Sequence, residues 1–386
     1  MRTNRHVTVQ PVVVLLSAVL AGCGASENAA DTQAGNAAAA QDSAGRVLEA
    51  PPPVSAQGPR VLVYHDMEGL SGQGDPNTFS ARHAEAYARG RELLTADVNA
   101  VIAGLFDGGA AVVHVVDAHG SGSPEPDLLL DELDERAEMV FRDAPFRQYV
   151  DLVAPDAYDA IAVVGMHAKT GSGGFASHTY TLGMDILMNG MSITETELIG
   201  YSWGRADVPV IFASGDDRLE ADLAGPMPWV RFVVVKRATS ASTAEPRPVA
   251  EAHADLREQA KQALLARDEA RVMRLTEPVR AALHAVAPAT VAMLDGVPGV
   301  RVSGDTASFA ATDFQAAYDG VIALIGVSRA GYQSVLAETI RSRPDGAQIM
   351  SAYSDALFAR WLDYESGRWT PPTAQPVAAR RYHGAN

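Results

Sequence analysis

Short apolar runs of five to seven residues recur along the first two thirds of the chain, separated by polar and glycine-containing stretches. Runs of this length are typical of strands buried on both faces of a parallel sheet. They predict strands at residues 60–64, 111–116, 158–164, 208–213 and 230–235. Between the first two lies a long amphipathic stretch, 81–106, which predicts a helix ended by Asp107-Gly108-Gly109. This alternation predicts an α/β domain at 59–248, with a mostly parallel, twisted sheet flanked by helices.

The pattern changes after residue 248. The elements expected there are a helix at 250–266, strands at 279–283, 289–294 and 300–311, and a second helix at 313–324. This order predicts a smaller α+β domain at 249–335. The rest, 336–386, is expected to be a C-terminal extension with a short amphipathic helix at 352–362 and a disordered final dozen residues.

The N-terminus has the features of an export signal. Arg2 and Arg5 precede an apolar stretch, 11–20, that is shorter than the ~20 residues of a membrane-spanning helix. The stretch ends in Leu20-Ala21-Gly22-Cys23, which resembles a bacterial lipobox, although an ordinary export signal with a chance cysteine is the alternative. Cys23 is the only cysteine, so an internal disulfide and a cysteine-rich metal site are excluded. We expect a lipoprotein signal peptide at 1–22 and a membrane anchor through lipid on Cys23.

Residues 23–58 are rich in Ala, Gln, Asn, Ser and Gly and close with three prolines. They offer too few apolar side chains to offset the entropy of ordering, so we expect a flexible tether. Gly24, after the cysteine, is not the aspartate associated with retention at the inner membrane. We therefore expect a protein of the cell envelope, held at the outer membrane and facing the periplasm. The net charge of −16, with no basic stripe, argues against a nucleic-acid partner.

Carboxylates and imidazoles follow several of the predicted strands. Asp66 and Glu68 follow the first strand, Asp117 and His119 repeat the same spacing at the second, and His167 follows the third. Residues two apart share a face if the strand continues that far. Ligands of open α/β sheets bind where the carboxyl ends of the strands meet. We therefore expect these side chains to gather in one crevice.

The charges in this set favour two metal ions. Asp66, Glu68 and Glu195 supply three negative charges, and a bridging hydroxide would complete the balance against two divalent cations. Without cations, such carboxylates would repel one another and raise one another's pKa. Zinc suits a mixed set of imidazoles and carboxylates, and manganese or cobalt would fit too. The competing interpretation is that these carboxylates and histidines are solvated loop residues. His65 and His114 lie an odd number of residues from the candidate ligands, so their side chains are expected to point away from the site.

Taken together, the motifs resemble the M55 peptidase family, the zinc-dependent D-aminopeptidases. The resemblance covers residues from about 60 to about 330, which is most of the predicted folded part. The matching segments are Asp66-Met67-Glu68-Gly69, residues 87–91, Asp117-Ala118-His119, Gly165-Met166-His167-Ala168, Ser177-His178, Glu195, Val208-Pro209-Val210, Gly215-Asp216-Asp217 and Val235-Lys236.

The resemblance implies a set of ligands for each of two zinc sites. Asp66 would bridge the two ions, with Glu68 and His167 completing one site and His119 and Glu195 the other. Around Glu195 the match is less definite, because Glu197 lies two residues further on and offers the same group.

The resemblance also places His178 where the family has a histidine proposed as the catalytic nucleophile. On chemical grounds, a general acid or a donor to the oxyanion are alternatives. Lys236 is expected either to anchor a substrate carboxylate or to cap its strand at the surface. Asp216 and Asp217 are expected either to position the site or to form a turn.

The implied function is release of N-terminal D-amino acids from short peptides by metal-activated water attack, in a homo-oligomer. One alternative is another dinuclear metal amidase or hydrolase on the same scaffold. A phosphoesterase is less favoured, because Lys169 and Lys236 are few cations for a phosphate clamp. The other alternative is a lipoprotein that binds peptides or metal without turnover.

Overall fold

The computed structural model describes residues 40–41, 45–143, 146–287, 289–328, 332–368 and 381–382. The chain divides into two units, Met1–Asn36 and Ala37–Asn386, and every described residue belongs to the second. The predicted signal peptide, Cys23 and most of the predicted tether lie outside the described residues. Among the described helices, none is both long enough and apolar enough to cross a membrane.

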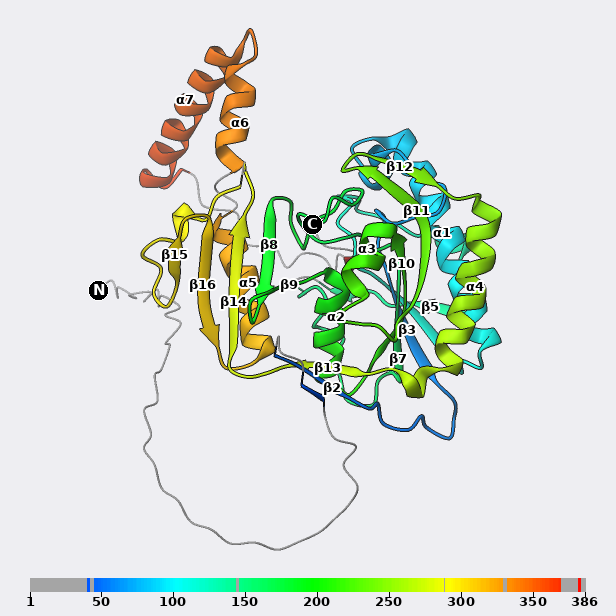
Figure 1. Ribbon diagram of the computed structural model, residues 1–386. Coiled ribbons are helices and arrows are strands. Elements are labelled where there is room, and N and C mark those ends of the chain that lie inside the picture. Colours follow the sequence, from blue (N-terminus) through cyan, green and yellow to red (C-terminus); the bar gives the residue numbers. More distant parts are fainter. Residues whose placement is uncertain are drawn as a thin grey trace, which may run out of the picture. The chain divides into compact units, whose positions relative to one another are not determined.

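The largest sheet has seven strands (Figure 1). From one edge to the other they are β12 (Thr243–Pro246), β11 (Arg231–Ser240), β10 (Val210–Asp216), β7 (Ala160–Val164), β3 (Arg60–His65), β4 (Val112–Asp117) and β5 (Ala137–Met139). All neighbouring pairs are parallel except β11 with β12. β7 and β10 are buried along their whole length, as expected for strands covered on both faces. The prediction of a mostly parallel α/β sheet is confirmed.

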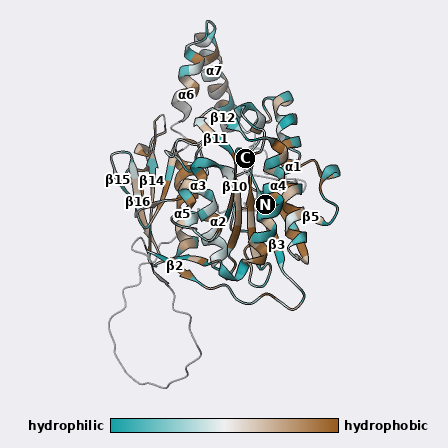
Figure 2. Ribbon diagram, turned by 45° about the vertical axis from the view of Figure 1, so that its right-hand side comes forward, coloured by the Kyte–Doolittle hydropathy of each residue, from teal (hydrophilic) through white to brown (hydrophobic). Residues whose placement is uncertain are grey.

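Helices cover both faces of this sheet. They are α1 (Ala84–Asp107), α2 (Glu195–Gly204), α3 (Asp217–Leu223) and α4 (Val249–Leu265). Val61 and Val63 of β3 share an apolar core with α1 and α4, whereas Leu62 and Tyr64 share the opposite core with α2 and α3. Successive strand side chains point to opposite faces, so one apolar run contributes to both cores. Figure 2 shows the resulting hydrophobic strands between more polar helices.

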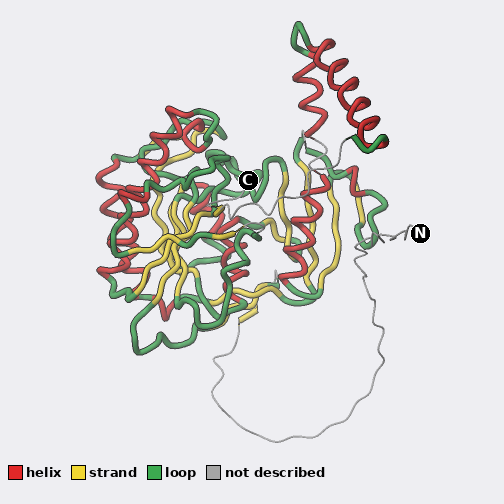
Figure 3. The backbone as a smooth tube through the Cα atoms, turned by 180° about the vertical axis from the view of Figure 1, so that it is seen from behind, coloured by secondary structure: helices red, strands yellow, loops and turns green. Residues whose placement is uncertain are grey.

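A second sheet has five antiparallel strands. In order they are β15 (Arg301–Ser303), β16 (Thr306–Ala311), β14 (Val279–Ala285), β8 (Met184–Met188) and β9 (Met191–Ser192). Helix α5 (Phe314–Ser328) packs on β14 and β16. Seen from behind in Figure 3, the strands of the two sheets form two separate groups. Both sheets nevertheless contribute to one continuous apolar core.

The structure divides the chain differently from the domain boundary predicted at residue 248. β8 and β9 come from the first predicted domain but pair within the second sheet. Helix α4, assigned to the smaller domain, packs instead on α1, β10 and β11 of the main sheet. The Asn189-Gly190 turn, with both residues at positive φ, is a local signal for the β8–β9 hairpin, but no local signal marks the pairing of β8 with the distant β14.

Part of the predicted tether is ordered. β2 (Arg46–Glu49) pairs with β13 (Val272–Leu275) and with β1 (Ala40–Gln41). Arg46 forms an ion pair with Glu197 (3.4 Å), and its Nε donates to the Tyr201 hydroxyl (3.1 Å). The prediction of a flexible tether is therefore wrong for residues 46–49, because specific polar contacts and strand pairing hold them against α2 and β13.

Two strands of the smaller region also differ from prediction. Residues 289–294 form a loop and a 3₁₀ turn, η4 (Ala292–Leu294), in which Val291 and Leu294 are buried. That spacing of three is helical, so the strand prediction was wrong there. The single strand expected at 300–311 is the β15–β16 hairpin, with Gly304 in the left-handed region at its turn.

Towards the C-terminus, α6 (Tyr332–Arg341) and α7 (Gly346–Glu365) contact each other, and the short helix predicted at 352–362 lies within α7. Within the predicted disordered end, β17 (Arg381–Tyr382) pairs with β6 (Arg142–Asp143). The remaining 3₁₀ turns are η1 (Pro76–Phe79), η2 (Leu130–Glu132) and η3 (Arg267–Glu269).

Candidate metal centre

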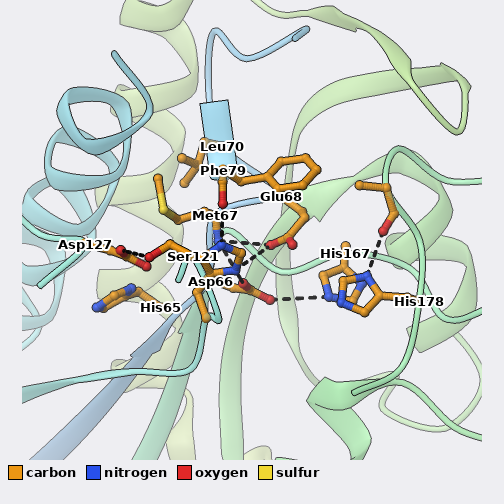
Figure 4. A network of polar contacts seen from close by, with 12 residues as sticks. His65, Asp66, Met67, Glu68, Leu70, Phe79, Ser121, Asp127, His167 and His178 are labelled. Atoms are coloured by element: carbon orange, nitrogen blue, oxygen red, sulfur yellow. Dashed lines mark hydrogen bonds and ion pairs between the residues drawn. The ribbon is translucent and has the colours of Figure 1, made fainter. Parts of the chain in front are cut away.

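Asp66 and Glu68 lie in a tight turn after β3. The strand ends at His65, so the condition that it continues through both carboxylates is not met. The turn is fixed instead by main-chain hydrogen bonds from Asp66 to Val164 (2.8 Å) and from Gly69 to Gly165 (2.7 Å). Both carboxylates nevertheless approach the same imidazole, that of His119 after β4, and Figure 4 shows that Asp66 also faces His167.

His119, which follows β4, lies between these carboxylates and a backbone carbonyl. Its Nδ1 is 2.9 Å from Asp66 Oδ1 and 3.2 Å from Glu68 Oε2. Its Nε2 is 2.7 Å from the carbonyl oxygen of Phe79. A carbonyl can only accept, so Nε2 carries the proton and donates it. This leaves Nδ1 as the nitrogen that faces the carboxylates, the usual arrangement for a metal-binding histidine.

His167, which follows β7, is oriented in the same manner as His119, but its two ring nitrogens have the opposite roles. Nδ1 donates to the Ala168 carbonyl (3.0 Å). Nε2 lies 3.4 Å from Asp66 Oδ2 and 3.6 Å from Glu195 Oε1, and it is buried without a hydrogen-bond partner among the described residues. A buried nitrogen aimed at two carboxylates fits a position in which it binds a cation.

His178 stacks on His167, with ring centroids 4.0 Å apart and planes 12° from parallel. Its Nδ1 is 2.8 Å from the Ala176 carbonyl, and its Nε2 is 3.9 Å from Glu195 Oε1. All three imidazoles therefore give one N–H to the backbone and turn the other nitrogen toward the carboxylate cluster.

Glu195, the first residue of α2, points into this cluster, whereas Glu197 does not. Glu197 forms a capping box with Thr194, accepting from the Thr194 backbone N–H (2.9 Å), and it also pairs with Arg46. Glu195 accepts from the Tyr180 backbone N–H (2.6 Å) and from the Tyr149 hydroxyl. Of the two candidates, Glu195 is the one that this geometry brings to the site.

Burial and mutual charge set the pKa values in the cluster. Burial raises the pKa of Asp66, and the neighbouring Glu68 charge raises it further. Burial would lower the pKa of both His119 and His167, but the surrounding carboxylates outweigh it, raising the pKa of His119 well above its usual value and that of His167 to about 9. Burial would raise the pKa of Glu68, yet His119 holds it below its ordinary range. The carboxylates thus favour protonated, positively charged imidazoles in the metal-free site. Bound metal cations would supply this positive charge instead.

The donor atoms fall into three groups, each of which could hold one ion. Within each group the atoms lie within 4.8 Å of one another; the groups are Asp66–Glu68–His119, Asp66–His167–Glu195 and Glu68–His167–His178. Asp66 belongs to two of them, as expected of a bridging ligand, and so do Glu68 and His167. The first two groups pair the remaining ligands differently from the resemblance, which joins Glu68 to His167 and His119 to Glu195, whereas the third group joins Glu68 to His167 as the resemblance does. Nitrogen and carboxylate oxygen donors in sets of three fit zinc with an open position.

Two other residues that the sequence singled out, His65 and Lys236, do not line the site. His65 is fully buried and neither ring nitrogen has a hydrogen-bond partner among the described residues, although Nδ1 lies 3.9 Å from Asp117 Oδ1; burial lowers its pKa to about 3. Lys236 is also fully buried, donating to the Glu68 carbonyl and Gln73 and lying 3.9 Å from the Phe175 ring centroid. Both roles expected for Lys236 were wrong, because the Phe175 loop covers the end of its strand.

Three aspartates support the site indirectly. Asp117 accepts from the His119 backbone N–H (2.8 Å). Asp216 caps the N-terminus of α3 and accepts from the Phe175 backbone N–H (2.8 Å), which fixes the loop before His178. Asp217 accepts from the Ala238 backbone N–H (2.8 Å). Asp216 thus has both of its expected roles, because it forms the turn that begins α3 and also positions the site through the Phe175 loop.

A cavity of about 550 Å³ opens over the cluster, and sequence reasoning missed half of its wall. Gln148, Tyr149 and Tyr180 line it together with the cluster residues. Tyr149 has a φ of 67°, and burial raises the pKa of its hydroxyl, which donates to Glu195. No apolar periodicity or motif marks residues 146–150, so nothing in the sequence indicated them.

Three comparisons with known proteins agree with one another. Residues 60–323 match the model of the M55 peptidase family, described as D-aminopeptidase. A curated D-aminopeptidase of Bacillus subtilis (strain 168) is 30% identical over 271 residues, which is 69% of this chain and 96% of that protein. A solved structure, the Zn-dependent D-aminopeptidase DppA from Bacillus subtilis, "a self-compartmentalizing protease", matches with a TM-score of 0.63 and 26% identity, covering 69% of this chain and 97% of that one.

Proposed function

This chain belongs to the M55 peptidase family, the D-aminopeptidases, and we propose that it is a two-zinc enzyme that releases N-terminal D-amino acids from short peptides. The observation that carries the proposal is the position of Asp66, which faces His119 on one side and His167 on the other. A carboxylate shared by two groups of donors is what two neighbouring ions require.

Asp66, Glu68 and His119 would hold one ion, and Asp66, His167 and Glu195 the other. When bound, two zinc ions supply Lewis-acid polarisation of a carbonyl and lower the pKa of water. Manganese or cobalt would suit the same donors. The Phe79 and Ala168 carbonyls keep the two imidazoles turned toward the site before any ion arrives.

The chain's own groups suit an aminopeptidase in two further ways. None of the described residues that line the cavity is Lys or Arg, so no side-chain cation repels the amine of a peptide N-terminus there. The Tyr149 hydroxyl keeps its proton because burial raises its pKa, and it donates that proton to Glu195, which orients this carboxylate in the site.

His178 can handle a proton at the reacting centre. With Nδ1–H donated to the Ala176 carbonyl, Nε2 of the neutral ring presents a lone pair toward the cavity. That atom can take a proton from the attacking water and return it to the leaving amine, and it can equally act as a nucleophile. A His178→Ala enzyme is expected to lose ~100-fold or more in kcat under either role.

The test compares D-Ala-Gly-Gly with L-Ala-Gly-Gly, measured as release of free alanine by the full chain with zinc and with a chelator. The proposal expects cleavage of the D-peptide alone, abolished by the chelator. Chelator-sensitive cleavage of the L-peptide would retain the metal site but overturn the stereochemistry. No turnover of either peptide with two metals bound would favour a different hydrolase or a binding protein.

We also propose that the protein is anchored in the cell envelope by lipid on Cys23. The support is the Leu20-Ala21-Gly22-Cys23 motif after a short apolar stretch with basic residues before it. Cys23→Ser is expected to move the protein from the membrane fraction to the soluble fraction of a bacterial lysate. An unchanged membrane fraction would contradict the anchor.

A homo-oligomer is part of the same proposal. Its support is the solved relative, which is described as self-compartmentalizing. Sedimentation of the purified full chain in detergent is expected to give a multiple of the monomer mass, and a monomer across micromolar concentrations would contradict it.

A further inference from the structure

A fully buried lysine contacts the backbone of a candidate metal ligand. Lys236 lies on β11, and its amine donates to the backbone carbonyl of Glu68 and to the side-chain carbonyl of Gln73. Its Nζ also lies 3.9 Å from the centroid of the Phe175 ring, within the range of a cation–π contact. Lysine is rarely buried completely, because its ammonium group loses its hydration. Its position here therefore calls attention to what its donors hold in place.

Gln73 extends this contact along the turn at residues 66–70. Its Nε2 donates to the Met67 carbonyl (2.6 Å), and its Oε1 accepts from the Leu70 backbone N–H (3.3 Å) as well as from Lys236. Together with the bond that the lysine itself makes to this turn, three consecutive parts of the main chain are held from within the fold. The turn carries two of the candidate metal ligands, so its backbone determines where their carboxylates lie.

Gln73 also reaches the segment that orients His119. Its Nε2 donates to Thr78 Oγ1 (2.8 Å), which lies in η1. The last residue of η1, Phe79, offers the carbonyl oxygen that accepts from His119 Nε2. That bond turns the other ring nitrogen of His119 toward the carboxylates. The glutamine thus connects the lysine to a second element that positions a candidate ligand.

These contacts serve one of the two proposed ions. The donors that the network supports are those of the group Asp66–Glu68–His119. Among the described residues, neither the lysine amine nor the glutamine side chain hydrogen-bonds to His167 or Glu195. Those two ligands are held by other backbone groups, on the loops that precede and follow them. A change in the network should therefore affect the two ions unequally.

We propose that Lys236 is a positioning residue for the ion held by Asp66, Glu68 and His119. Through the Glu68 carbonyl and through Gln73 it fixes both the turn and the carbonyl that orients the imidazole, so these ligands are in place before the ion binds. Hydrogen bonds behind metal ligands raise metal affinity in this way. This inference rests on the proposed two-zinc function and adds a residue that acts on one ion of the pair.

The test measures the two stepwise zinc affinities of the full chain by competition with a chelating dye, in the wild type and in Lys236→Met. Methionine has a similar length and fills the same space without donors. We expect the affinity for one ion to fall about 10–100-fold, as when a hydrogen bond behind a metal ligand is lost, and that for the other to stay within about twofold. With saturating zinc, kcat for D-Ala-Gly-Gly should fall about tenfold while KM changes by less than about twofold.

Gln73→Leu and the double variant test whether the effect passes through the glutamine. Each single substitution removes the bond between the amine and Oε1, so the double variant should lose less zinc affinity than the sum of the two single losses. Gln73→Leu alone is expected to weaken the same ion by about tenfold, which keeps the test decisive if Lys236→Met fails to fold. The control is Lys261→Met on α4, whose amine lies 3.8 Å from Glu258 of the same helix. It is expected to leave both zinc affinities unchanged.

The outcomes separate this inference from the proposed function. Equal weakening of both ions in Lys236→Met, or of neither, would overturn the inference, because a general loss of stability does not distinguish one ion from the other. Unchanged zinc binding in Gln73→Leu, or additive losses in the double variant, would overturn the connection through the glutamine. A wild type that binds two zinc ions but releases no alanine from D-Ala-Gly-Gly would overturn the proposed function alone. A wild type that binds fewer than two zinc ions would overturn both.

Discussion

The two walls of the cavity are built in different ways. The strand-end wall comprises Asp66, Glu68 and His119, with His167 beside Asp66; each of these residues lies one to three residues beyond a strand of the parallel sheet. The loop wall comprises Gln148, Tyr149, His178 and Tyr180, which lie on irregular segments. The first wall and His167 supply four of the five candidate metal ligands, Glu195 at the start of α2 being the fifth, and the second wall presents groups suited to the peptide. The difference indicates that sheet register positions the ions and that loop geometry selects the substrate.

Backbone conformation separates the walls further. On the strand-end wall, the left-handed position falls on a glycine, Gly165, with φ of 74°. On the loop wall, three non-glycine residues have positive φ: Tyr149 at 67°, Ala176 at 52° and Tyr180 at 64°. Such conformations cost of order 1–3 kcal/mol each and persist only where surrounding contacts hold them. Here the contacts include the bond from Tyr180 N–H to Glu195 and that from Phe175 N–H to Asp216.

The largest effect is expected on the strand-end wall, from Asp66→Asn. Loss of the shared carboxylate removes a ligand from both ions, so zinc content should fall and kcat/KM should decrease by about a thousandfold or more. The control is Glu197→Gln, which changes a carboxylate that pairs with Arg46 outside the cavity. Full zinc content in Asp66→Asn, or zinc loss in Glu197→Gln, would contradict this assignment of the wall.

Gly165→Ala tests whether the strand-end wall depends on a close backbone approach. A Cβ at this position would collide with the Asp66 carbonyl oxygen, and its φ disfavours any other residue. We expect a loss of about 2–4 kcal/mol in the free energy of unfolding, measured in denaturant. Gly190→Ala is the matched control, because it has a similar φ of 84° but open space around it, so strain alone should cost about 1–2 kcal/mol. Equal losses in both variants would show that the close approach is unimportant.

On the loop wall, Tyr149→Phe should have a smaller effect that spares the metal. The substitution removes the hydroxyl that donates to Glu195 and keeps the ring in the core. We expect kcat to fall about 10–100-fold, as for other groups that orient a ligand, with zinc content unchanged at saturating zinc. Tyr158→Phe, which removes a hydrogen bond to His114 elsewhere in the fold, should leave kcat unchanged. Wild-type activity in Tyr149→Phe would exclude a role for this wall in positioning Glu195.

The smallest effect concerns His65, the imidazole at the end of β3 that points away from both walls. Its pKa is about 3 in the folded protein and near 6.5 when unfolded, so between these values only the unfolded chain takes up the proton. Stability of the metal-free protein should therefore fall as pH decreases from 6.5 toward 3, with at most one proton contributing ~1.4 kcal/mol per pH unit. His65→Phe should reduce that slope, while His284→Gln, at an exposed position of β14, should not. An unchanged slope in His65→Phe would contradict the burial of a neutral imidazole here.

Sequence reasoning predicted the strand-end wall because its signals are local. Apolar runs mark the ends of β3, β4 and β7, and the residues that follow them stand out by chemical type. The loop wall has no such signal, since neither Gln148 nor Tyr149 belongs to a periodic segment. The identity of a tyrosine also does not indicate that its φ is left-handed. Lys236 was misplaced for a related reason: its burial depends on Phe175, sixty-one residues earlier in the chain.

The fold, like the site, was predictable only where the sequence signal is local. The parallel sheet was predictable from β3, β7 and β10, which contain continuous apolar runs at 61–64, 160–164 and 210–213. The second sheet was predicted only in part, because it joins β14 to β8, nearly one hundred residues earlier. Pairing between distant segments depends on tertiary packing that local patterns do not encode.

The most direct test of this account is the number of zinc ions bound per chain, measured by elemental analysis of the full-length protein after dialysis against a slight excess of zinc. The account expects two ions in the wild type, two in Tyr149→Phe despite its altered kinetics, and loss of zinc in Asp66→Asn. One ion or none in the wild type, or loss of zinc from Tyr149→Phe, would contradict the division of the cavity into a wall for metal and a wall for peptide.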